Sequence, residues 1–192
     1  MEFRKAKSND DPVAIGTLIY NTDRWVYPAL FGDIDIAIAA TPALLAGDCV
    51  YNHDNMYVAV EDGKIAGYMA LTNGAPSGNR KCFEQAILGS GAALPPAFDS
   101  VMREYFDLVK PDPDKTEVLS LSVLPEFRRR GVASFMLSKL DPNITYTLAC
   151  VRDNAPAREL YRKAGFEFMF EYPGYTGIPC VELIRHKRGD NQ

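Results

Sequence analysis

The clearest pattern in the chain is an alternation of apolar and polar residues over 117–124, which reads EVLSLSVL. Period-two alternation is typical of a strand with two different faces. Val118, Ser120 and Ser122 fall on one face, and Leu119, Leu121 and Val123 fall mostly on the other. Pro125 ends the strand because it has no N–H for the ladder.

Two hairpins and two further strands complete the predicted sheet. Residues 56–61 and 65–71 are expected to pair around Asp62-Gly63-Lys64, since Asp-Gly readily takes the positive φ values of a tight turn. The second hairpin is expected near the end of the chain, at 166–172 and 180–186, around Pro173-Gly174 and Gly177. The other two strands are expected at 1–7 and 144–151.

Helices are predicted where apolar residues recur every three or four positions and where capping residues flank the segment. Asp10-Asp11-Pro12 begins one that ends near 21–23, and Asn154 begins one that ends at Ala164 with Gly165 as a left-handed cap. Others are expected at 34–45, 98–109 and 131–140. No element is assigned within 73–96, which is rich in Gly, Ser, Ala and Pro. The order of elements predicts a mixed α/β (α+β) fold.

Composition narrows the class of protein. A chain of 192 residues with 47% hydrophobic residues is expected to form one domain over 1–192. A net charge of −4 gives no electrostatic footprint for nucleic acid. There is no run of eighteen apolar residues, and the start MEFRKAKSNDDP does not resemble a signal peptide, so we expect a cytoplasmic protein with no membrane partner. Four scattered cysteines and two histidines predict neither a metal site nor a disulfide framework.

The strongest chemical signal lies in residues 122–133, SVLPEFRRRGVA. A strand ends at a proline, a basic turn follows, and Gly131 opens a helix whose first N–H groups are unpaired and able to bind an anion. Gly131 also lets a phosphate approach the backbone closely. The alternative is a solvated arginine cluster. Neither GxGxxG nor the P-loop pattern is present, so nucleotide-binding Rossmann and NTPase folds lose support.

These residues resemble the acyl-CoA signature of the GNAT superfamily of acetyltransferases, Arg/Gln-x-x-Gly-x-Gly/Ala. Here it reads Arg128-x-x-Gly131-x-Ala133. A second block, Asn154-x-x-Ala157-x-x-Leu160-Tyr161-x-x-x-Gly165-Phe166, resembles the family's N-x-x-A-x-x-L-Y-x-x-x-G-F. The two blocks follow in the family's order and cover residues 117–170. The resemblance implies a mostly antiparallel sheet in which strands 117–124 and 144–151 run parallel and splay apart.

The resemblance also implies how acetyl-CoA is bound. Leu121 and Val123 are expected to pair with the pantetheine arm through their backbone groups, beside a bulge that opens the slot. The pyrophosphate is expected at the amides and charges of the basic turn, which comprises Arg128, Arg129, Arg130, Gly131, Val132, Ala133 and Ser134. Asn154 is expected to contact the pantetheine, to cap its helix, or to do both.

Two side chains are candidates for the chemistry. Tyr161 is expected to protonate the leaving thiolate, the alternative being a core aromatic whose hydroxyl reaches the surface. Glu117, at the start of the central strand, is expected to take the proton of the amine, directly or through water. The alternative for Glu117 is an exposed carboxylate at a strand end. No metal is expected, and transfer is expected to be direct, without a covalent enzyme intermediate.

The acceptor side is expected mainly in 10–50 and 73–113, with a helix over the pocket. Trp25, Tyr27 and Phe31 could line that pocket or belong to the core, and Asp33 and Asp35 could recruit an amine or simply begin a helix. The resemblance implies transfer of an acetyl or short acyl group to a primary amine of a small molecule or a peptide, and a homodimer is left open. The same fold without turnover would be an acyl-CoA sensor, and a basic turn for an unrelated anion is the remaining alternative.

Overall fold

The computed structural model of the 192-residue chain describes residues 1–73, 79–106, 112 and 114–189. Within these residues, seven strands form one sheet in the order β1-β2-β3-β4-β5-β7-β6. The strands are β1 (Glu2–Lys5), β2 (Met56–Glu61), β3 (Lys64–Asn73), β4 (Thr116–Val123), β5 (Tyr146–Val151), β6 (Glu167–Pro173) and β7 (Pro179–Arg185). All neighbours are antiparallel except β4 and β5. The expected mixed, mostly antiparallel sheet is therefore confirmed.

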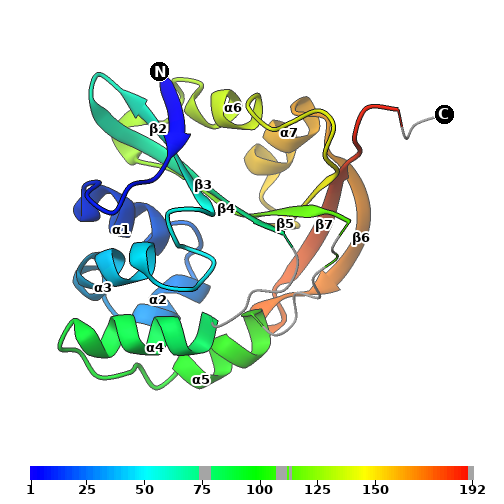
Figure 1. Ribbon diagram of the computed structural model, residues 1–192. Coiled ribbons are helices and arrows are strands. Elements are labelled where there is room, and N and C mark those ends of the chain that lie inside the picture. The colour runs from blue at the N-terminus through cyan, green and yellow to red at the C-terminus, as the bar shows by residue number, and fades with distance from the viewer. Residues whose placement is uncertain (74–78, 107–111, 113, 190–192) are drawn as a thin grey trace.

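Helices cover both faces of this sheet. Figure 1 shows α1 to α5 on one side and α6 and α7 on the other, with β6 and β7 bending toward α5. The helices are α1 (Pro12–Tyr20), α2 (Val26–Phe31), α3 (Ile34–Ala46), α4 (Asn79–Gly89), α5 (Phe98–Val101), α6 (Val132–Leu137) and α7 (Ala155–Lys163). The two faces of the sheet are thus covered by different sets of helices.

Several helices differ from the sequence prediction. α2 and α4 were not expected, and the helix expected at 98–109 is a single turn of α-helix followed by a π-helical stretch, Met102–Phe106. Residues 107–109 of that prediction lie outside the described residues. α6 ends at Leu137 rather than at residue 140. The hydroxyl of Ser138 donates to the carbonyl of Phe135 at 2.7 Å, a local bond of the kind that competes with helix continuation.

The crossing of α1 on α3 is close, and it depends on Gly16. A Cβ placed on Gly16 would lie 2.6 Å from Ile38 Cα and 2.8 Å from Thr41 Oγ1. Backbone atoms cannot yield as a flexible side chain does, so α1 and α3 would have to separate.

We expect Gly16→Ala to lower the free energy of unfolding by about 1–3 kcal/mol, as overpacking does in a close-packed core. Gly89→Ala is the matched control, because a Cβ there meets nothing within 4 Å. Alanine favours helix, so this control should be neutral or slightly stabilising. Denaturant unfolding of both variants checks the prediction, and equal stabilities would contradict it.

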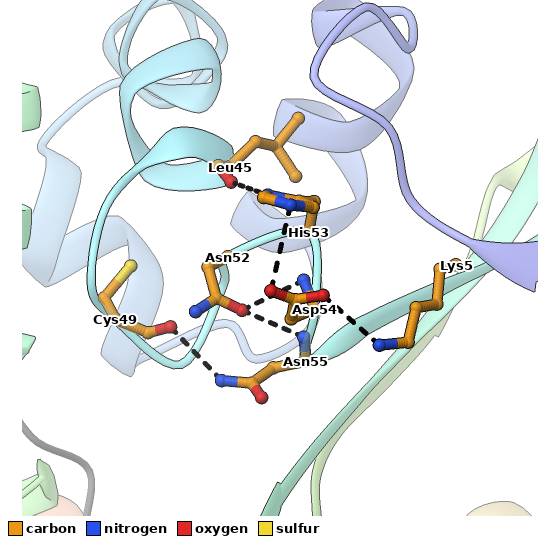
Figure 2. Close-up of polar contacts among 7 residues, drawn as sticks. All are labelled: Lys5, Leu45, Cys49, Asn52, His53, Asp54 and Asn55. Atoms are coloured by element: carbon orange, nitrogen blue, oxygen red, sulfur yellow. Dashed lines mark hydrogen bonds and ion pairs between the residues drawn. The ribbon is translucent and has the colours of Figure 1, made fainter.

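The loop between α3 and β2 is held by its own polar side chains (Figure 2). Asn52 Oδ1 accepts hydrogen bonds from the N–H groups of Asp54, at 3.1 Å, and Asn55, at 2.9 Å. The same loop carries Tyr51, which is fully buried, and whose hydroxyl donates to Ser120 Oγ on β4 at 3.3 Å. The loop therefore supports the central strand from the face covered by α1 to α5.

Candidate active site

The parallel strands β4 and β5 separate shortly after they begin to pair. They pair only at Thr116 with Tyr146 and at Glu117 with Thr147. On its other edge β4 stays paired with β3 up to Val123, with a register shift that leaves Leu119 as the extra residue of a bulge. A bulge increases the local twist and bends the strand. The expected bulge and the diverging parallel pair are both present, and they open a gap in the middle of the sheet.

The bulge also decides where the backbone groups of β4 point. Beyond it, the N–H of Leu124 donates to the carbonyl of Ala66 next to β3 at 2.9 Å. Hydrogen-bonded positions alternate in an antiparallel ladder, so Ser122 faces β3 while Leu121 and Val123 face the gap. The open edge of β4 is thus a short template for an extended ligand, at the two positions expected from the sequence.

After β4, the chain turns sharply before α6. Arg129 has φ of 63° and Gly131 has φ of 83°, both in the left-handed region. Gly131 caps α6, and the next three residues, Val132, Ala133 and Ser134, supply the first N–H groups of that helix. Such groups have no intrahelical carbonyl to donate to. The turn therefore presents free amide donors at the same end of the gap as Val123.

Two of the three arginines of this turn contact other parts of the protein. Nε of Arg128 donates to the carbonyl of Val123 at 3.1 Å, which ties the turn back to β4. Arg130 forms an ion pair with Glu61 at 3.0 Å and lies over the ring of Phe127 at 5.3 Å from its centroid. All three side chains are exposed. The charge of Arg130 is therefore balanced by Glu61 of the β2–β3 hairpin. The sequence pattern did not distinguish Arg130 from its neighbours.

α7 supplies the second block of the expected site. Asn154 caps it, since its Oδ1 accepts from the N–H of Ala157 at 3.2 Å. Tyr161 is partly buried and packs edge-on against Phe166, with ring centroids 6.0 Å apart. Burial, with a smaller contribution from Cys150 on β5, raises the pKa of Tyr161 above its ordinary value. The Tyr161 hydroxyl thus keeps its proton throughout the neutral range.

On the opposite face of the sheet lies a cavity of about 630 Å³. Its floor is formed by β4, β5 and β7, and its walls by the α1–α2 loop, the π-helical stretch, β6 and the loop after β6. Its titratable carboxylates are Asp23, Glu104, Asp112, Glu117 and Glu182, and its apolar walls include Trp25, Leu119, Phe170, Tyr172 and Ile178. A second cavity, of about 640 Å³, lies against α1 and residues 124–127, and β5 takes no part in it.

Glu117 and Glu182 both lie on the floor of the cavity lined by β4, β5 and β7. Burial, with repulsion from Glu182, raises the pKa of Glu117 to about 7. Burial also raises the pKa of Glu182 to about 7, although Lys115 opposes the shift. Both carboxyls are therefore poised to take up or release a proton near neutral pH. Sequence reasoning found Glu117 and missed Glu182, whose only signal was a single charge inside the apolar strand segment CVELI.

The residues suggested from the sequence for the acceptor side are mostly elsewhere. Of the aromatic patch, only Trp25 lines the cavity, while Tyr27 and Phe31 are fully buried in the core. Asp33 caps α3 by accepting from the N–H of Asp35 at 2.8 Å, and neither residue lines the cavity. Tyr27 and Phe31 are therefore core residues, and Asp33 and Asp35 belong to the start of α3.

The described part of the chain offers neither a metal site nor a membrane-spanning helix. Residues 1–73, 79–106, 112 and 114–189 contain no group of three His, Cys, Asp or Glu side chains arranged to hold a metal. Over the same ranges, no helix has the length and apolar character needed to cross a bilayer.

Comparison with known proteins identifies the same regions. Residues 19–166 match the model of the acetyltransferase (GNAT) family, a range that includes the gap, the basic turn and α7. Comparison with curated protein sequences gave no match.

Solved structures show the same fold. An N-acetyltransferase from Staphylococcus aureus Mu50 is 21% identical with a TM-score of 0.73, over 96% of this chain and 100% of that chain. An acetyltransferase of the GNAT family from Streptococcus agalactiae 2603 is 15% identical with a TM-score of 0.60, over 97% and 95%. The NatB acetyltransferase complex, bound to CoA and MES, is 14% identical with a TM-score of 0.54, over 96% and 98%.

Proposed function

The chain belongs to the acetyltransferase (GNAT) family, whose members transfer acyl groups from acyl-CoA, and from that premise we propose that it acetylates a primary amine by direct attack on acetyl-CoA. The observation that carries the proposal is the gap between β4 and β5, which has free backbone groups on one side and the carboxylate-lined cavity on the other. The donor enters from the face of α6 and α7, and the acceptor from the opposite face.

The donor is held mainly by backbone. Leu121 and Val123 offer N–H and C=O groups to the amides of the pantetheine arm, as one strand does to another. The amides of residues 129–134 and the charges of Arg128 and Arg129 receive the pyrophosphate. Arg130, paired with Glu61, contributes less charge than its neighbours. Asn154 remains a candidate pantetheine contact, because its Nδ2 is left over after its Oδ1 has capped α7.

The transfer step uses one base and one acid. The amine nitrogen attacks the thioester carbonyl, a C–N bond forms, and the C–S bond breaks. Glu117, whose pKa of about 7 leaves it partly ionised in neutral solution and strong enough as a base, takes the proton that the amine loses. Tyr161, kept neutral by burial, donates its proton to the departing thiolate. After product release, proton exchange with solvent returns Glu117 to its carboxylate form and Tyr161 to its neutral form.

The proposal is tested by measuring CoA binding and thiol release separately. Calorimetry should show saturable binding of CoA in the micromolar range, and a panel of primary amines should release free thiol from acetyl-CoA. Binding without release for any amine would instead support an acyl-CoA sensor. Absence of CoA binding at millimolar ligand would overturn the donor site itself.

A further inference from the structure

The acceptor cavity contains two half-buried carboxylates, Glu117 and Glu182. Within the described residues, neither Glu117 nor Glu182 has a hydrogen bond or an ion pair. A charge taken out of water is strongly unfavourable unless it is paired. Glu182 stands on β7 opposite Ala149, two residues along β5 from Thr147, the partner of Glu117. The floor of the cavity therefore carries an acidic pair that one reacting amine does not balance.

Further negative charge lines the cavity outside its floor. Asp23, in the α1–α2 loop, uses Oδ1 to accept from the N–H groups of Trp25 and Val26, both at 2.7 Å, so its Oδ2 is left for a ligand. Glu104, in the π-helical stretch, is partly buried, and its ion pair among the described residues is with Arg103 at 3.7 Å. The walls of the cavity thus carry carboxylates as well as its floor.

The described cation that lines the cavity already forms an ion pair. Lys115 is the only lysine or arginine among the described lining residues, and its Nζ lies 2.7 Å from Asp112. Among the described residues, Asp23, Glu117 and Glu182 form no ion pair with a lysine or arginine, and Glu104 has Arg103 at 3.7 Å. An acceptor that carries a carboxylate or a phosphate would meet like charges in the cavity, which disfavours it strongly.

The rest of the cavity lining is largely apolar. Trp25, Leu119, Phe170, Tyr172 and Ile178 line the cavity together with its carboxylates. Methylene groups buried against such side chains are stabilised by the hydrophobic effect. The cavity therefore combines carboxylates with apolar surface, which is the complement of a chain of methylenes with an ammonium group at each end.

We propose that the acceptor is an aliphatic diamine or polyamine, held with its reacting end at Glu117 and Glu182 and its second ammonium toward Asp23 and Glu104. The proposal names the substrate of the acetylation site and rests on the proposed function. The reacting nitrogen gives its proton to Glu117 as described above, while the far ammonium stays charged and fixes the orientation.

The test compares three acceptors of one length with acetyl-CoA as donor: 1,5-diaminopentane, pentylamine and 5-aminopentanoic acid. We expect kcat/KM for the diamine to exceed that for pentylamine about tenfold, which corresponds to about 1.4 kcal/mol. The amino acid should be poorer than pentylamine, because its carboxylate would lie against Asp23 and Glu104. Raising the salt concentration should shrink both differences, since the contacts are electrostatic.

Variants assign the preference to the cavity. Glu104→Gln and Asp23→Asn should each bring the diamine-to-pentylamine ratio of kcat/KM toward one, and asparagine at 23 keeps the oxygen that caps α2. Asp35→Asn is the matched control, because Asp35 lies outside the cavity, and its ratio should stay that of the native protein.

The outcomes separate the two proposals. Equal kcat/KM for the three acceptors, or a ratio unchanged by Glu104→Gln and Asp23→Asn, would overturn the diamine assignment and leave amine acetylation standing. Failure of every amine to release thiol, in a protein that still binds CoA, would overturn the acetyltransferase proposal and the diamine assignment with it.

Discussion

Replacement of Glu117 by glutamine is expected to lower kcat/KM at pH 8 by about 10²- to 10⁴-fold, the contribution of a well-placed general base. Glutamine keeps the shape of the side chain but cannot accept a proton from the ammonium. The donor site lies across the gap, so the affinity for CoA should change little. Steady-state kinetics with a saturating amine, together with calorimetry of CoA, measures the two effects separately.

The pH dependence should identify the same group. The pKa of Glu117 is raised to about 7, so its basic form disappears below that pH and accumulates above it. In the native protein kcat/KM should therefore rise tenfold per pH unit below about pH 7 and level off above it. Glu182 titrates in the same range, so the measured value belongs to the pair. In Glu117→Gln this acid limb should shift or vanish.

Folding provides the control for this variant. Because the pKa of Glu117 is higher in the folded chain than in the unfolded chain, the carboxylate lowers stability as the pH rises from about 4.5 to about 7. Glu117→Gln removes that term and should be no less stable than the native protein at pH 8. Glu84→Gln, on α4 outside the cavity, should leave kinetics unchanged. A native rate in Glu117→Gln would refute the assignment of the base.

Replacement of Tyr161 by phenylalanine is expected to lower kcat about 10²-fold or more, with CoA affinity and folding stability nearly unchanged. Only the hydroxyl is removed, and the edge contact of the ring with Phe166 remains. Without an acid, the C–S bond must break to a free thiolate, and the loss should be smaller for a thioester whose leaving thiol is more acidic.

Tyr57→Phe is the matched control for loss of a hydroxyl. Tyr57 lies on β2, stacked on Phe3 with ring centroids 5.3 Å apart, and does not line the acceptor cavity. Its kcat should equal that of the native protein. If Tyr161→Phe turned over at the native rate, Tyr161 would be a structural aromatic, as the alternative reading of the sequence has it.

The donor half of the site was predictable because its signals are local. Proline after a strand, glycine at a left-handed position and Asn154 at a helix start each act on backbone within a few residues. The short alternating strand that ends at Pro125 is local in the same sense. Such features are dictated by sterics and by the hydrogen bonds of neighbouring residues, and they survive in any context that lets the segment fold.

The acceptor half was not predictable in the same way. Tyr27 and Phe31 are as aromatic as Trp25, yet packing places the first two in the core and the third at the cavity. α2 begins where Asp23 accepts backbone N–H groups, and the cavity uses the same carboxylate. Which face of a short apolar segment is buried depends on the helices around it, and these come from distant parts of the chain.

The sequence by itself determined the central strand that ends at Pro125, the basic turn and the helix that carries Tyr161, because each depends on neighbours in the chain, and the resemblance of its two motifs indicated the fold family and the bulge. Only the tertiary structure decided that Glu117 and Glu182 line one cavity together with Asp23 and Glu104. Glu117 and Glu182 are far apart in sequence and meet because β5 brings β4 and β7 together on its two sides. The burial that raises both pKa values, and the repulsion from Glu182 that adds to the shift of Glu117, exist only once the sheet has formed.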